Sequence, residues 1–147
     1  NVALSLIESE TQYSEDEILK LVKEKLSLVG LENIEKLKPS ELSGGMKKRV
    51  ALARALITNP EYILYDEPTT GLDPIMSDSI DLLIKELSEK LKVTSIVVTH
   101  DMFSVINVAH RVAMINEGKI YFEGKPEEIL NSKDPIIYEF IKRTEKL

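Results

Sequence analysis

Two short stretches of this chain carry side chains and backbone suited to phosphate and metal chemistry. The first is a turn of Ser43, Gly44 and Gly45 that comes just before an expected helix. A helix start offers free backbone amides and the positive end of the helix dipole, and glycine lets the backbone approach a phosphate closely. The turn is therefore a candidate anion site, although such a turn taken alone is more often only a helix cap.

The second stretch is the acidic pair Asp66 and Glu67, which follows the apolar run 62–65. A short apolar run between Pro60 and an acid predicts a buried strand. Ligands in open α/β sheets bind at the carboxyl ends of the strands. Phosphoryl transfer needs one group that holds Mg²⁺ and another that positions the attacking water. The pair is a candidate hydrolytic centre, and the alternative is an ordinary acidic turn after a strand.

Two further polar residues extend this set. Asp73 stands before Pro74, an order typical of a helix N-cap followed by proline in the first turn. His100 follows the β-branched run 94–98, which predicts a second buried strand. The other histidine, His110, lies where we find no chemistry, so we interpret it as structural or solvent-facing. Two histidines this far apart form no metal motif.

Helices and strands alternate along most of the chain, which predicts an α/β fold with a helical lobe in front. Ser14 and Glu17 form a capping box, and Gly30 stops the helix that they start. The elements expected after it are a helix over roughly 46–57, strands over 62–65 and 94–98 with a helix from Pro74 between them, a short helix after Asp101, a hairpin of 111–115 and 119–122, and helices from Pro126 and Pro135.

Composition excludes several classes of function. The 147 residues carry a net charge of −6, which argues against broad nucleic-acid binding. The absence of cysteine excludes disulfides and thiolate zinc sites, and no apolar run approaches the roughly 20 residues of a membrane helix. The run Lys47-Lys48-Arg49 is a local basic exception, which we interpret as solvated helix surface in preference to a phosphate site.

Four motifs in order resemble those of the ATP-binding subunit of an ABC transporter: Leu-Ser-Gly-Gly-Met at 42–46, Tyr-Asp-Glu-Pro at 65–68, Gly-Leu-Asp at 71–73 and Val-Thr-His-Asp at 98–101. The resemblance implies a helical signature subdomain over 1–58. It also implies the C-terminal half of a P-loop NTPase (RecA-like) core with a mainly parallel sheet over 59–147.

No P-loop is present, because no two of the six glycines have its five-residue separation. ABC subunits carry that loop upstream of the signature motif, so we expect this chain to be the C-terminal part of a longer protein. We expect the isolated chain to be inactive and marginally stable. Without the strands that complete the sheet, apolar surface should stay uncovered at Ile63, Leu64, Ile96 and Val97.

The resemblance also implies a role for each candidate residue in a site shared by two ATPase subunits that bind ATP and Mg²⁺. The turn of Ser43, Gly44 and Gly45 would contact the γ-phosphate of ATP on the opposite subunit. Asp66 would bind Mg²⁺, and Glu67 would activate water. Asp73 would make a contact across the dimer interface, and His100 would sense the γ-phosphate.

Met46 indicates one subfamily of ABC ATPases, because most ABC signature motifs have Gln at this position. Met46 with the residues that follow it is similar to the ATPases of Mla-type systems, which move phospholipids with MCE-domain partners. The expected partners are a second copy of the ATPase, an integral membrane permease and an MCE-domain protein, at the cytoplasmic face of the inner membrane, and no nucleic acid.

Three alternatives stay open. The chain could serve another import or export system. It could belong to a soluble ABC-type ATPase acting on DNA or ribosomes, although the single short helix over 14–29 argues against the long coiled coil of the chromosome-maintenance type. It could also be a truncated binding module without enzymatic activity, which nucleotide binding by the isolated chain would test.

Overall fold

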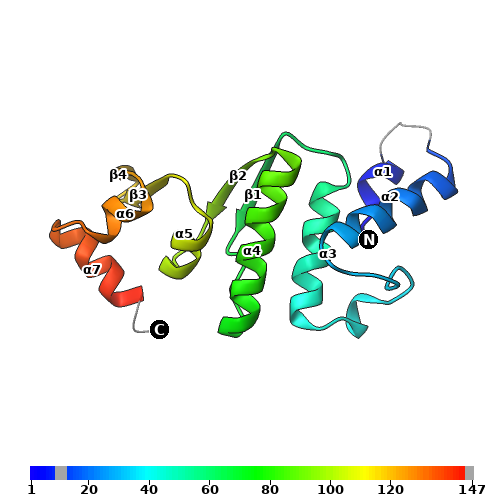
Figure 1. Ribbon diagram of the computed structural model, residues 1–147, viewed down its shortest axis with the longest axis horizontal. Coiled ribbons are helices and arrows are strands. Elements are labelled where there is room, and N and C mark those ends of the chain that lie inside the picture. The colour runs from blue at the N-terminus through cyan, green and yellow to red at the C-terminus, as the bar shows by residue number, and fades with distance from the viewer. Residues whose placement is uncertain (9–12, 145–147) are drawn as a thin grey trace.

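The computed structural model describes residues 1–8 and 13–144. After an all-helical beginning its helices and strands alternate, and the described part ends in a hairpin followed by two helices, so the predicted α/β fold is confirmed (Figure 1). In chain order they are α1 (Leu4–Glu8), α2 (Glu15–Leu28), a 3₁₀ turn η1 (Pro39–Glu41), α3 (Gly44–Leu56), β1 (Tyr62–Asp66), α4 (Pro74–Leu91), β2 (Thr94–Val98), α5 (Met102–Val108), β3 (Val112–Asn116), β4 (Lys119–Gly124), α6 (Pro126–Leu130) and α7 (Pro135–Thr144).

Local capping explains where the main helices begin. The Ser14 hydroxyl accepts from the Glu17 amide at 3.3 Å, and the Glu17 carboxylate accepts from the Ser14 amide at 2.8 Å. The predicted capping box of α2 is therefore confirmed. Gly30 follows this helix with φ +71°, a left-handed conformation that glycine adopts without strain. Helix α3 begins at Gly44, two residues earlier than expected.

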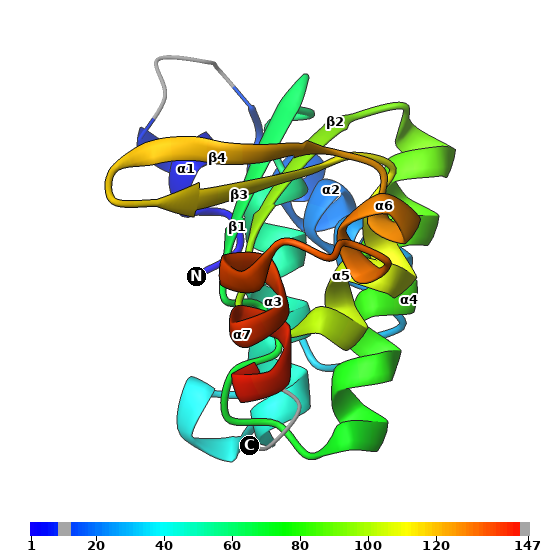
Figure 2. The ribbon, with the colours of Figure 1, turned by 90° about the vertical axis from the view of Figure 1, so that its left-hand side faces the viewer.

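The strands form two separate pairs. Strands β1 and β2 are parallel, with Tyr62 opposite Thr94 and Asp66 opposite Val98. Strands β3 and β4 form the predicted antiparallel hairpin, which lies across one end of the molecule (Figure 2). Of the strands that the structure describes, one pair is thus parallel and one antiparallel.

The prediction that β1 and β2 are buried strands is wrong for one of their faces. Ile63 and Tyr65 are buried, whereas Leu64 is 75% exposed and Ile96 is 52% exposed. Successive side chains of a strand point to opposite faces, and the described helices cover only one face of this pair. The expected uncovered surface is therefore confirmed at Leu64 and Ile96, but not at Ile63. Val97 is half-buried against the core.

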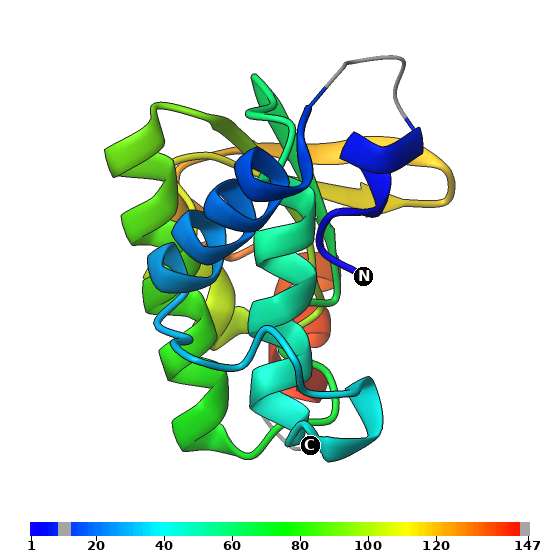
Figure 3. The same cartoon turned by 90° about the vertical axis from the view of Figure 1, so that its right-hand side faces the viewer.

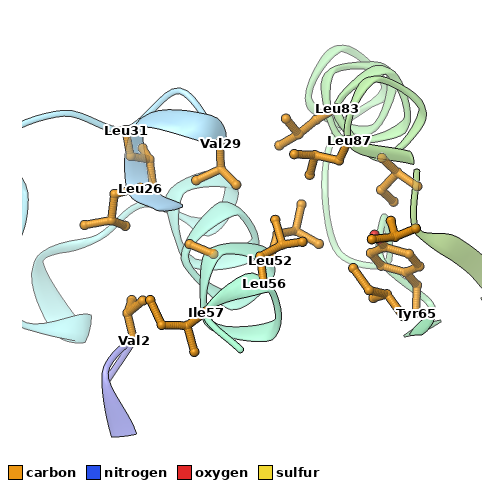
Figure 4. Packing of buried hydrophobic residues seen from close by; sticks show 14 of the residues in the cluster. Val2, Leu26, Val29, Leu31, Leu52, Leu56, Ile57, Tyr65, Leu83 and Leu87 are labelled. Atoms are coloured by element: carbon orange, nitrogen blue, oxygen red, sulfur yellow. The ribbon is translucent and has the colours of Figure 1, made fainter. Parts of the chain in front are cut away.

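Buried side chains from α2, α3, α4 and β1 form the main core. Figure 4 shows Leu52 and Leu56 of α3 between Leu26 of α2 and Tyr65 of β1. The short helix α1, which no sequence pattern predicted, adds Leu6 to the same core. Figure 3 shows α1, α2 and α3 grouped at the N-terminal end of the molecule.

A second, smaller core holds the C-terminal part together, and its buried members are Met102, Met114, Ile129 and Ile137. These residues come from α5, β3, α6 and α7 in turn. Among the helices of residues 1–8 and 13–144, none combines the length and the apolar character that a membrane crossing requires.

Candidate functional site

The parallel register brings the acidic pair and His100 to one edge of the sheet. Asp66 ends β1 opposite Val98, which ends β2. The Glu67 amide then donates to the Val98 carbonyl oxygen at 2.9 Å, which extends the pairing by one residue. Since both strands run in the same direction, the residues that follow them emerge side by side. The structure therefore places Glu67 beside His100, two residues beyond Val98.

Both carboxylate oxygens of Glu67 have a partner. The His100 ring Nδ1 lies 2.7 Å from Oε1 of Glu67, and the Thr70 hydroxyl donates to Oε2 at 3.1 Å. The side chain of Glu67 is 32% exposed and that of His100 is 57% exposed, so water can reach both groups. The contacts hold the carboxylate in one orientation at a solvent-accessible edge, which suits a group that must act on a water molecule.

The backbone of Glu67 is strained. Its φ of +47° lies in the left-handed region, which costs a non-glycine residue roughly 1–3 kcal/mol. Such strain persists only where surrounding contacts enforce it. Here the Glu67 amide bonds Val98, and its carbonyl oxygen accepts from the Thr70 amide at 3.3 Å. The structure thus holds Glu67 by its backbone as well as by its carboxylate.

The environment keeps the Glu67 carboxylate ionised. Burial raises the pKa of this carboxyl group, but the hydrogen bonds from His100 and Thr70 and the electrostatic effect of His100 lower it by more. The resulting pKa lies below the ordinary glutamate value. The stabilisation from these contacts is complete above the ordinary glutamate pKa. It is lost as the pH falls through the lowered pKa of the folded state.

We expect His100→Ala to raise the pKa of Glu67 toward its ordinary value, because the substitution removes the ring hydrogen bond and the electrostatic effect of the ring. The measurement is an NMR titration of the Glu67 side-chain carbonyl carbon between acidic and neutral pH. His110→Ala is the matched control, since His110 is exposed and lies after α5, away from the acidic pair. An unchanged titration of Glu67 in the His100 variant would contradict the assigned contact.

The turn of Ser43, Gly44 and Gly45, called the signature turn below, provides the N-cap of α3, as its sequence predicted. The Ser43 hydroxyl accepts from the Met46 amide at 3.2 Å. Gly45 is buried, and a Cβ atom added there would lie 1.9 Å from the terminal methyl carbon of Met76. A Cβ added at Gly44 would lie 3.7 Å from Leu72. Gly45 therefore allows a close approach between the signature turn and the start of α4.

Asp73 lies close to the signature turn in the structure. Its carboxylate accepts from the Met76 amide at 3.0 Å and caps α4, with Pro74 at the first helical position. Because Met76 also contacts the position of Gly45, the structure places Asp73 near the signature turn of the same chain. The Asp73 side chain remains exposed, so the capping role leaves it open to other contacts.

The basic run after Met46 is only partly a solvated surface, which corrects the sequence interpretation. Lys47 is exposed, but Lys48 donates from Nζ to the Glu67 carbonyl oxygen at 3.3 Å. Arg49 donates at 2.6 Å to the Val29 carbonyl oxygen and at 2.6 Å to the Ser79 hydroxyl. Lys48 and Arg49 therefore fix α3 to the Glu67 loop, to the end of α2 and to α4.

Asp66 stands apart from these networks. Its side chain is exposed at the end of β1, and within residues 1–8 and 13–144 no three potential ligand side chains gather into a metal site. Mg²⁺ is usually held by one or two carboxylates together with phosphate oxygens and waters. A single accessible carboxylate such as that of Asp66 is compatible with this donor set.

Sequence reasoning missed two residues of the site. Thr70 lies three positions after Glu67, a spacing at which a turn can join two side chains, so a search for local hydrogen-bonding pairs would have found it. Lys48 lies 19 positions before Glu67, and its type and spacing gave no signal for the contact.

Comparisons with known proteins converge on one family. A family model described as ABC transporter matches residues 3–70. The chain is 45% identical over 142 residues to the intermembrane phospholipid transport system ATP-binding protein MlaF of Haemophilus influenzae, covering 97% of this chain and 53% of MlaF. It is 44% identical over 125 residues to the methionine import ATP-binding protein MetN of Halalkalibacterium halodurans, covering 84% of this chain and 37% of MetN.

A solved structure agrees with these relatives. The dimeric ATP-binding cassette MJ0796, in a post-hydrolysis state bound to ADP and phosphate, superposes with a TM-score of 0.72 at 38% identity. The match covers 85% of this chain and 54% of that cassette. The chain spans about half the length of MlaF and of the cassette and 37% of the length of MetN.

Proposed function

The chain belongs to the ABC transporter family, and on that premise we propose that the protein binds ATP with Mg²⁺ and hydrolyses it to drive transport across a membrane. The observation that carries the proposal is the Glu67 carboxylate, ionised and held between Thr70 and His100 at the edge of the sheet. A carboxylate fixed in this way and open to water has the properties of a general base.

In this proposal two copies of the protein share each ATP. Glu67 of one copy orients the attacking water and accepts its proton, and His100 contacts the γ-phosphate. The turn of Ser43, Gly44 and Gly45 on the other copy donates to the same phosphate from the start of α3. The solved cassette that resembles this chain is a dimer bound to ADP and phosphate, which supports a shared site. Asp73 would lie at the interface.

Asp66 would hold Mg²⁺, which neutralises developing negative charge on the phosphate oxygens. The neighbouring carboxylate of Glu67 already has bonds to His100 and Thr70, whereas that of Asp66 is exposed. The two adjacent acids would therefore have different roles: Asp66 would hold the metal, and Glu67 would act on water.

We further propose that the transported molecule is a phospholipid. Support comes from Met46 with the basic residues after it and from the 45% identity to a phospholipid-transport ATPase. The second candidate is nutrient import, which the 44% identity to a methionine-import ATPase favours. In either case the ATPase would act at the cytoplasmic face of the inner membrane, on an integral permease.

Recovery of the partners distinguishes these two candidates. We expect the tagged protein, expressed from its whole gene and purified from detergent-solubilised membranes, to carry with it an integral permease and an MCE-domain protein. The measurement is mass spectrometry of the purified complex, with ATPase activity assayed on the same sample. A permease recovered with a solute-binding protein, and without an MCE-domain protein, would contradict phospholipid transport and support nutrient import.

A further inference from the structure

The side chain of Lys48 joins the signature helix to the residue proposed to act on water. Lys48 lies on α3, five residues after the Ser43 cap, and its Nζ donates to the Glu67 carbonyl oxygen at 3.3 Å. Both residues are half-buried. A hydrogen bond from an ammonium group is charge-assisted and about twice as strong as a neutral one. The contact therefore has the strength to influence the peptide that it holds.

The Glu67 peptide needs such support because its φ is +47°. Its amide is held from β2 by Val98, and its carboxylate is held by His100 and Thr70. The carbonyl oxygen is shared between the Thr70 amide, which belongs to the same turn, and Lys48. Lys48 thus connects α3, the helix that begins at the signature turn, to the turn from Glu67 to Thr70.

Helix α3 is also tied to its other neighbours. Arg49, next to Lys48, bonds the Val29 carbonyl oxygen at the end of α2 and the Ser79 hydroxyl on α4. Gly45 packs against Met76 in the first turn of α4. A displacement of the signature turn would therefore move α3 together with these contacts, and Lys48 would transmit that displacement to Glu67.

We propose that Lys48 is a positioning residue that couples the two ATP sites of the dimer. The inference rests on the proposed function, in which the signature turn contacts the ATP of the partner subunit while Glu67 acts in the site of its own subunit. Engagement of the turn fixes α3, and Lys48 then holds the Glu67 peptide so that the carboxylate stays aimed at the water. Lys48 touches neither nucleotide nor water itself.

The test compares Lys48→Met with Lys47→Met in the protein expressed from its whole gene. Both variants lose one ammonium group from adjacent positions, but the Lys47 side chain is exposed and makes no hydrogen bond within the described part of the chain. We expect Lys48→Met to lower kcat for ATP about 10–100-fold, the cost of a small misplacement of a catalytic group, with KM for ATP unchanged. Lys47→Met keeps the wild-type kcat, and Lys48→Arg, which keeps a charged donor, restores part of the loss.

A second measurement does not depend on activity. In the same protein, Lys48→Met makes the Glu67 amide proton exchange faster with solvent, because a displaced peptide weakens its bond to the Val98 carbonyl oxygen, whereas Lys47→Met leaves the exchange rate unchanged. Lys48→Gln, which is polar but shorter, repeats both measurements if the Met variant does not fold.

Equal kcat values for the Lys48 and Lys47 variants would overturn the inference, as would an unchanged exchange rate of the Glu67 amide in Lys48→Met. Wild-type protein without ATPase activity would instead refute the proposed function, and the exchange rate of the Glu67 amide alone would then decide whether Lys48 positions Glu67.

Discussion

Glu67→Gln is expected to abolish ATP turnover, by on the order of 10²–10⁴-fold, the range for loss of a general base. The amide is nearly the same size as the carboxylate, but it cannot accept a proton from water. ATP binding is expected to remain, because in this proposal the phosphates are held by the signature turn, His100 and the Mg²⁺ ligand Asp66. Dimers that form on ATP addition should therefore persist instead of dissociating after hydrolysis.

The measurements are phosphate release and size-exclusion chromatography with ATP, on the protein expressed from its whole gene. Glu61→Gln is the matched control, because Glu61 is exposed and precedes β1, at the opposite end of the strand from Glu67. We expect it to behave as wild type. A Glu67 variant that retained most of its turnover would show that another group activates the water.

Features built from neighbouring residues were predictable from the sequence. The caps at Ser14, Ser43 and Asp73 each join groups three residues apart, so the spacing alone indicates the bond. The hairpin likewise followed from Asn116 and Gly118 between two apolar runs. In each case the physical cause lies within a few positions of the chain.

Features that depend on distant residues were not predictable in the same way. The exposure of Leu64 depends on which helices cover the sheet, and an apolar run gives no sign of it. The bond from Lys48 to Glu67 spans 19 residues, and those of Arg49 reach α2 and α4. A basic run on a helix has the same sequence whether its side chains meet water or carbonyl oxygens.

The candidate site was predictable from the sequence only in part. The resemblance to ABC ATPases predicted that Glu67 and His100 belong together, and the parallel register explains their 2.7 Å contact. The left-handed backbone of Glu67 had no sequence signal, because it arises from bonds to β2 and α3 that form only on folding. Strain of this kind concentrates at functional positions, which supports the role proposed for Glu67.

Ser43→Arg is expected to abolish ATP-driven dimerisation while leaving the ATP affinity of the single subunit unchanged. The Ser43 side chain is exposed at the start of α3, and a long cation in its place would occupy the approach to the partner's phosphate. Without the dimer, turnover should fall to the level of the Glu67→Gln variant. The measurements are dimer formation by light scattering and ATP affinity by calorimetry.

Two further variants separate the phosphate contact from helix capping. Ser43→Asp keeps a side chain that can cap α3 but places a negative charge beside the phosphate, so we expect it to block dimerisation as the Arg variant does. Ser14→Ala removes the comparable cap of α2, worth about 0.5–2 kcal/mol, away from the signature turn. We expect it to lower the melting temperature without affecting dimerisation. If Ser43→Asp dimerises normally on ATP, Ser43 is only a helix cap, and the shared ATP site loses its support from this turn.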